Sequence, residues 1–108
     1  MEPNMEPGVF KDFFVGFVKI HILYHASNEP MYGVEMLEEL ARHGYRLSPG
    51  TLYPTLHRLE REGYLSVERK VVEGKMRKYY YATKQGRAVL SASKDKIAEL
   101  VEEVLLDR

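Results

Sequence analysis

The sequence predicts a mainly α-helical fold with a small β-hairpin, namely a winged helix–turn–helix core with N-terminal and C-terminal dimerisation helices. Four segments carry apolar residues at helical spacing, and two strand-like segments joined at Glu73-Gly74 precede the last of them. The order helix, helix, helix, hairpin, long helix is that of a winged helix–turn–helix extended by one helix. A length of 108 residues is enough for one such domain and too short for two ordinary ones.

The chain is expected to begin with a flexible N-terminal arm over residues 1–9, followed by the winged helix–turn–helix domain over 10–83 and a C-terminal dimerisation helix over 84–108. The first helix is expected from about Phe10 to Ala26. Its apolar residues cover more than one face, so it must be buried on several sides. The most economical burial is against a second copy of the chain. The alternative is a helix in the core of its own chain, and both can hold along its length.

The helix–turn–helix is expected next. A turn-rich stretch over 27–33 leads into an amphipathic helix that ends at Gly44, because glycine favours a helix stop. Ser48 is a good N-cap for the following helix, and Pro49 fits its first position. The inner face of this third helix carries leucines at i, i+4 and i+7: Leu52, Leu56 and Leu59.

The outer face of the third helix is polar and basic. Hydroxyls and a phenol can bond phosphates there, whereas Arg and His can reach base edges or backbone. Gly50 allows close approach to a phosphate, and free N–H groups at a helix start favour an anion. The alternative is a capped surface helix with an idiosyncratic proline. The outer residues are Gly50, Pro54, His57, Arg58 and Arg61, flanked by Thr51, Tyr53 and Thr55.

The hairpin is expected from strands over 64–72 and 75–82, with a basic tip and flank. Thr83 can cap a last helix over about 84–106. That helix carries an apolar seam at heptad-like spacing, formed by Leu90, Ile97, Val101, Val104 and Leu105.

Charge is segregated along the chain, although the net charge is zero. The balance is −5 over residues 1–41, +7 over residues 42–87 and −2 over residues 88–108. The basic block contains the third helix and the hairpin. A basic surface confined to one segment is typical of a nucleic-acid binder, and the alternative is an ordinary solvated face.

The composition argues against several classes of protein. The absence of cysteine excludes disulfides, Cys-ligated zinc and thiol nucleophiles, and it fits a cytoplasmic location. The sequence begins without the basic cluster of a signal peptide, and no apolar run approaches the roughly 20 residues that span a bilayer. No membrane partner and no cofactor is expected. No nucleophile–base pair, phosphate-binding glycine loop or paired carboxylates stand out, so an enzyme is not expected.

Two side-chain clusters could carry other chemistry. His21 and His25 have the i, i+4 spacing of metal ligands on a helix. No third ligand is evident, so no metal site is expected, and packing at a dimer interface is the preferred interpretation. The run Tyr79, Tyr80 and Tyr81 could stack on bases. Because alternate strand residues face opposite sides, at least one of these tyrosines is expected in the core.

Two runs form a long and specific motif, YGVEMLEELARHGYRLSPGTLYPTLHRLEREGYL and GKMRKYYYATKQG. They closely resemble the PadR family of transcriptional regulators. The matching elements are Tyr32-Gly33, Ser48 through Gly63, Gly74 through Tyr80 and Thr83 through Gly86. Two features depart from the family pattern. Lys75-Met76 stands where the family usually has Arg and often proline, and the chain lacks the tryptophan with which some short members line an interface drug pocket.

The resemblance implies a homodimeric repressor that binds a pseudo-palindromic operator in double-stranded DNA. It also implies a small hydrophobic or aromatic effector that is sensed near the dimer interface and releases the repressor. Together with the outer face of the third helix, it places DNA contacts at Ser48, Gly50, Thr51, Tyr53, Pro54, His57, Arg58, Arg61, Lys75, Arg77, Lys78 and Tyr80. Dimer contacts are expected on the first and last helices, at Phe10, Phe13, Phe14, Phe17, His21, Leu90, Ile97, Val101, Val104 and Leu105.

Two other functions compete with this interpretation. A winged-helix protein-interaction module would explain the fold and the neutral net charge, but not the coincidence of the basic block with the third helix and hairpin. A ligand-binding buffer or small enzyme would need convergent polar groups in a pocket, and the sequence does not reveal them.

Overall fold

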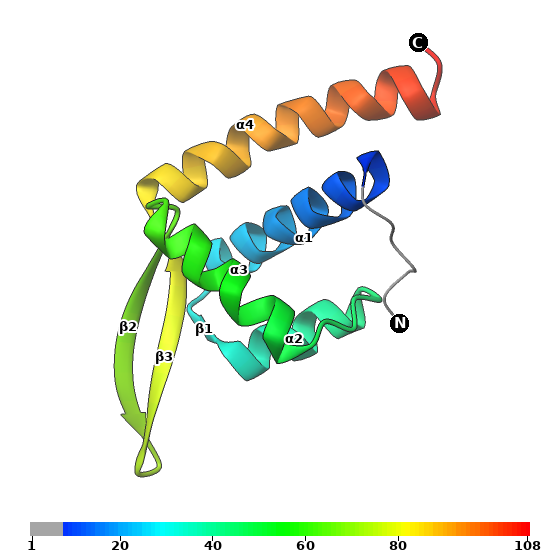
Figure 1. Cartoon of the computed structure of the whole chain (residues 1–108). Helices are drawn as coiled ribbons and strands as arrows, with labels where there is room; N and C mark the ends of the chain where they lie inside the picture. The colour runs from blue at the N-terminus through cyan, green and yellow to red at the C-terminus, as the bar shows by residue number, and fades with distance from the viewer. Residues whose placement is uncertain (1–7) are drawn as a thin grey trace.

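The computed structural model describes residues 8–108 (Figure 1), so most of the predicted N-terminal arm, residues 1–7, lies outside the described residues. The described residues confirm the predicted fold class. Their elements, in chain order, are α1 (Val9–Asn28), β1 (Met31–Tyr32), α2 (Gly33–Arg42), α3 (Pro49–Arg61), β2 (Leu65–Val72), β3 (Lys75–Ala82), α4 (Lys84–Leu100) and a π-helical turn η1 (Val101–Leu105).

Helix α1 is the central core helix of its own chain over most of its length. It begins one residue before the predicted Phe10 and continues two residues beyond Ala26. Its side chains buried in the core of the chain recur at helical spacing, as Phe14, Val18, Ile22, Leu23 and Ala26. Large apolar side chains near its N-terminus, by contrast, are exposed. The core interpretation therefore holds for most of the helix, and burial against a second copy stays a prediction for its N-terminal end.

Strand β1 is an element that the sequence analysis missed, because it covers only two residues of the turn-rich stretch before α2. It pairs antiparallel with β3, with Met31 opposite Tyr80 and Tyr32 opposite Tyr79, in a sheet of order β1-β3-β2. This pairing fixes the start of α2 against the base of the hairpin. The helix–turn–helix and the hairpin are therefore joined by backbone hydrogen bonds and not only by packing.

The hairpin of β2 and β3 turns at Glu73-Gly74, as predicted. Glu73 has φ 52° and Gly74 has φ 78°, which is the left-handed pair that a two-residue type I′ turn requires. Val72 lies opposite Lys75, and the register continues to Leu65 opposite Ala82. The turn sits at the far end of the hairpin from the helices, so the hairpin projects from the body of the molecule (Figure 1).

Helix α4 is anchored at its first turn by Thr83, as predicted. The Thr83 hydroxyl accepts a hydrogen bond from the Gly86 backbone N–H at 3.0 Å and donates one to the Gly63 carbonyl at 2.6 Å. Gly86 lies against the Tyr64 carbonyl so closely that any Cβ there would collide with it. The predicted single helix over 84–106 differs at its end, because the α-helix stops at Leu100 and continues as the wider turn η1.

The molecule is elongated, with principal extents of 54, 31 and 23 Å. Its radius of gyration of 15.0 Å exceeds the roughly 13 Å expected of a compact domain of this length. The hairpin and the second half of α4 both extend beyond the core (Figure 1). In the part of the chain that the structure describes, no helix is long and apolar enough to cross a membrane.

Candidate nucleic-acid interface

The first turn of α3 presents backbone and hydroxyl groups to solvent. Ser48 is the N-cap and Pro49 the first helical residue, as predicted. Within the described chain, the Ser48 hydroxyl caps no backbone N–H group and instead lies 3.2 Å from Thr51 Oγ1. Pro49 has no N–H group, and the N–H groups of Thr51 and Leu52 donate to the Ser48 carbonyl at 3.0 Å. The Gly50 N–H is therefore the group of this exposed turn that can bind an anion such as a DNA phosphate.

The two faces of α3 are separated as the leucine spacing predicts. Leu52, Leu56 and Leu59 are buried in the core. Pro54 stands inside the helix without ending it. Most of the predicted contact residues of this helix are exposed on the other side, as Ser48, Gly50, Thr51, Pro54, His57, Arg58 and Arg61.

Tyr53 differs from these residues because it is half-buried. Its ring fills the space that a Cβ on Gly33 would occupy, so the two residues are in direct contact. Gly33 is the first residue of α2. This contact explains why glycine follows Tyr32, and it fixes the position of Tyr53 relative to the start of α2.

The wing, defined as β2, β3 and their turn, carries basic side chains on both of its faces. The exposed Lys75 and Lys78 lie on β3. Between them, the Arg77 guanidinium lies over the Tyr32 ring, 4.4 Å from its centroid. A side-chain hydrogen bond with Tyr79 raises the pKa of Arg77 above its ordinary value. Arg77 is thus held in place by β1 and by its own strand.

Tyr80 was predicted to contact DNA, and its burial corrects that prediction. Its side chain is only 1% exposed and belongs to the core, where burial raises the pKa of its phenol. Tyr80, Lys78 and Met76 alternate along β3 and therefore share one face of the strand. Tyr80 is nearest the helices and is covered by them, whereas Lys78 and Met76 lie farther out and remain exposed.

The outer face of α3 and the wing meet in a hollow of about 400 Å³. Residues from α3, from β3 and from the β1–α2 junction contribute to its walls. Polar and basic groups from distant segments of the sequence thus converge on one concave surface. The lining residues are Tyr32, Gly33, Tyr53, His57, Met76, Arg77, Lys78 and Tyr80.

Two further basic residues of the wing were missed by the sequence analysis. Arg69 lies directly opposite Lys78, and Lys70 lies directly opposite Arg77. Like charges in directly opposed positions destabilise a β-ladder. Lys70 is partly compensated by an ion pair with Glu68 at 3.1 Å. The register of the hairpin, which follows from a two-residue turn at Glu73-Gly74, was the signal that could have identified both residues.

The predicted dimer contacts fall into two groups. Phe14 and Leu90 are 7% and 6% exposed and lie in the core of their own chain, so their side chains are not free to meet a partner. The other apolar residues are at least one-third exposed, on the N-terminal part of α1 and the C-terminal part of α4. The two helices contact each other and run in opposite directions (Figure 1). The exposed apolar residues are Phe10, Phe13, Phe17, Ile97, Val101, Val104 and Leu105.

His21, the remaining predicted dimer contact, is half-buried within a group of aromatic side chains. Its ring stacks on Phe17 with a centroid distance of 5.0 Å and lies 5.2 Å from the Tyr45 ring centroid. His25 is next to it, and His43 from the end of α2 completes the group. A third histidine near His21 and His25 is not evident from the sequence, because His43 is distant along the chain.

Comparisons with known proteins agree with this architecture. The model of the transcriptional regulator PadR-like family matches residues 22–92. The chain is similar to transcriptional regulator Rv3488 of Mycobacterium tuberculosis, with 50% identity over 95 residues that cover 88% of this chain and 89% of that protein.

Solved structures of PadR-like regulators are also similar to this chain. A PadR-like transcription factor from Bacteroides fragilis is similar with a TM-score of 0.79 and 29% identity, covering 91% of this chain and 96% of that chain. A PadR family transcriptional regulator from Eggerthella lenta is similar with a TM-score of 0.78 and 33% identity, covering 91% of this chain and 88% of that chain.

Proposed function

Because this chain belongs to the PadR-like family of transcriptional regulators, we propose that it is a homodimeric repressor that binds a pseudo-palindromic operator in double-stranded DNA. It is a transcriptional regulator and not an enzyme. In the proposal, α3 enters the major groove and the wing contacts the flanking phosphates. The protein acts in the cytoplasm, where it has access to DNA.

The observation that carries this proposal is the convergence of α3 and the wing on one concave, basic surface. His57 of α3 and Arg77 and Lys78 of β3 line the hollow. Outside it, the same two elements expose Arg58, Arg61 and Lys75. The like-charged cross-strand pairs of the wing have a cost in the free protein that a bound polyanion would offset. A neutral protein-binding module has no need of such pairs.

The homodimer is supported by the exposed apolar side chains of α1 and α4. Val104 and Leu105 are 68% and 75% exposed, and Phe10 and Phe13 are 53% and 52% exposed. The start of α1 and the end of α4, which carry these side chains, lie at the same end of the molecule (Figure 1). A concentration of exposed apolar side chains marks an interaction surface, and a second copy of the chain would cover it.

The proposed effector is a small hydrophobic or aromatic molecule that binds near this interface. Phe10, Phe13 and Phe17 supply the aromatic surface for it, and the Phe13 and Phe17 rings meet edge to face at a centroid distance of 5.5 Å. Effector binding would change the separation of the two α3 helices across the dimer. DNA affinity depends on this separation, because each α3 must reach its own half-site.

Operator binding is tested by titration against a duplex selected from a random pool, at several salt concentrations. Affinity is expected to fall steeply with salt, because each phosphate contact releases counterions. Arg58→Ala is expected to lower affinity by tenfold or more, which corresponds to about 1–3 kcal/mol for a base-reading Arg. Lys96→Ala is the control, because it also removes one positive charge but does so on α4, outside the proposed DNA contacts. There Lys96 pairs with Glu99 at 3.3 Å. A flat salt response would favour the protein-interaction module instead.

A further inference from the structure

Three imidazole rings converge where α1 packs against the end of α2. His21 and His25 are one turn apart on α1, and His43 is the C-cap residue of α2. Each side chain offers one nitrogen atom such that the three atoms lie within 4.8 Å of one another. The ring centroid of His43 lies 5.1 Å from that of His21 and 5.4 Å from that of His25.

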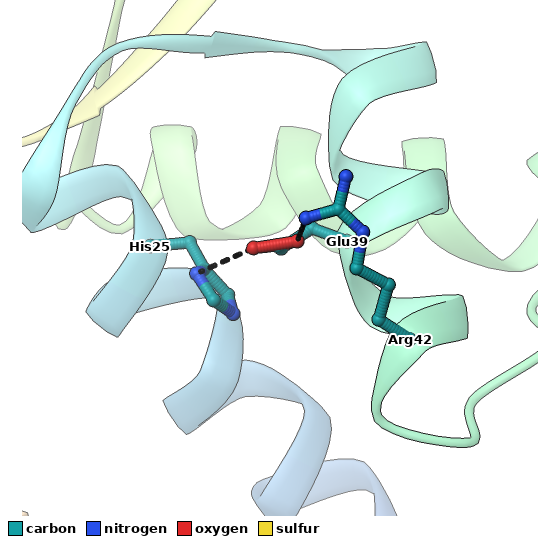
Figure 2. A network of polar contacts seen from close by, with 3 residues as sticks. All are labelled: His25, Glu39 and Arg42. Carbon is teal, nitrogen blue, oxygen red and sulfur yellow. Dashed lines mark hydrogen bonds and ion pairs between the residues drawn. The ribbon is translucent and has the colours of Figure 1, made fainter.

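His25 is the member of this group that ordinary packing does not explain. The residue is 8% exposed, and its Nε2 is buried without a hydrogen-bond partner among the described residues. A buried polar atom without a partner is uncommon and costs stability. The opposite ring nitrogen, Nδ1, lies 3.9 Å from Glu39 Oε1 (Figure 2).

Glu39 places His25 in an arrangement known from metal sites. Histidine ligands commonly direct one ring nitrogen to a carboxylate and the other to the metal, because the carboxylate fixes the ring and increases its basicity. Glu39 is itself held by Arg42, whose guanidinium donates a hydrogen bond to Oε2 at 2.9 Å (Figure 2). The orphaned Nε2 of His25 is thus the atom that such an arrangement leaves for a ligand.

The surroundings of His21 and His25 disfavour the charged form of both side chains. Burial is the main cause that lowers the pKa of each; Glu39 partly opposes this shift for His25, and the neighbouring His43 adds to it for both. Only neutral imidazole carries the lone pair that a metal needs. The Phe17 and Tyr45 rings pack against His21.

We propose that His21, His25 and His43 bind one divalent transition-metal ion of the Zn²⁺ class, with a water molecule in the fourth position. Imidazole ligands select Zn²⁺, Ni²⁺, Co²⁺ or Cu²⁺ over Mg²⁺ and Ca²⁺. With Zn–N distances of about 2.0–2.1 Å, two ligand nitrogens on a tetrahedral ion lie about 3.4 Å apart. The three rings must therefore rotate and close slightly on binding, and the exposed His43 has the freedom to do so.

The ion would connect α1 to the first helix of the helix–turn–helix. It would thereby fix the angle between the helix that carries the proposed dimer surface and the helix that supports α3. The proposed ligands and the Glu39 that orients His25 all come from one chain, so the metal site does not rest on DNA binding or on dimerisation.

The test is calorimetric titration of the EDTA-treated full-length protein with Zn²⁺. One ion per chain is expected, together with an increase in the melting temperature and no response to Mg²⁺. His43→Ala is expected to lower Zn²⁺ affinity by tenfold or more, because it removes one of three ligands. His57→Ala is the matched control, because it removes the one histidine outside the cluster and is expected to leave Zn²⁺ binding unchanged.

Circular dichroism of the variants without metal checks that each is folded. His43→Ala is expected to fold, because His43 is exposed and its side chain is not part of the core. Co²⁺ provides a second readout, since a tetrahedral Co²⁺ site absorbs visible light and His43→Ala should remove that absorption. The proposal is overturned if the wild type binds no stoichiometric Zn²⁺. It is also overturned if His43→Ala and His57→Ala affect binding equally, which would indicate adventitious surface binding only.

Discussion

At the scale of single residues, the glycines of the helix–turn–helix have different roles that their sequence positions alone do not reveal. Gly33 and Gly50 both stand in the first turn of a helix. A Cβ on Gly33 would collide with the Tyr53 ring, whereas a Cβ on Gly50 would find only Ser48 Oγ, at 3.7 Å. The first glycine is required by packing, and the second leaves the helix start open to a ligand.

Gly33→Ala is therefore expected to lower the free energy of unfolding by about 1–3 kcal/mol, the usual cost of overpacking. The Tyr53 ring would have to leave its position, so operator affinity should fall as well. Gly50→Ala is the matched control, and alanine there should leave stability equal or raise it by up to about 1 kcal/mol. Urea unfolding of both variants measures the difference. Equal stability of the two variants would contradict the assigned contact.

At the scale of elements, the sequence correctly predicted the helices, strands and turns that local residue patterns determine. The leucine spacing of α3 and the Glu73-Gly74 turn each depend on neighbouring residues, and both were found correctly. Strand β1 was missed because its two residues become a strand only by pairing with β3. Strand alternation could place one of the three consecutive tyrosines in the core, but the identity of Tyr80 as that residue depends on how far the helices cover β3. The approach of His43 to α1 is likewise a tertiary effect.

The wing allows a prediction in which stability and function change in opposite directions. Arg69 opposes Lys78 in the β-ladder. Arg69→Ala removes this repulsion, so the free energy of unfolding should stay constant or increase by a few tenths of a kcal/mol. Operator affinity should fall. The slope of log affinity against log salt concentration should become smaller by about 1, because one phosphate contact is lost. Thermal unfolding and salt-dependent DNA titration measure the two effects.

A loss of stability in Arg69→Ala, with unchanged DNA affinity, would assign Arg69 a structural role and remove the wing from the proposed interface. Lys96→Ala again serves as control, because surface ion pairs such as Lys96–Glu99 contribute little to stability.

At the scale of the whole molecule, the second half of α4 has little support from its own chain. Of this helix, only Gly86 and Leu90, both in its first half, are buried, and every residue from 94 to 108 is exposed. Isolated helices of this length are marginal in water, and helices in proteins depend on packing of their apolar face. The proposed second copy of the chain would account for both the elongated shape and the exposed apolar side chains, because it would cover α1 and α4.

Val104→Lys tests that explanation, because it places a charge among the exposed apolar residues of α4 and η1. A charge buried in an apolar interface without a partner is strongly unfavourable. The variant is therefore expected to be a monomer, whereas the wild type is expected to be a dimer. Sedimentation velocity measures the change, and helical content should fall as the end of α4 loses its support. Asp95→Asn is the matched control, because it changes the net charge by the same amount in the same direction on the opposite side of α4. A Val104→Lys protein that sediments as a dimer would place the interface elsewhere and leave the exposed end of α4 without a partner.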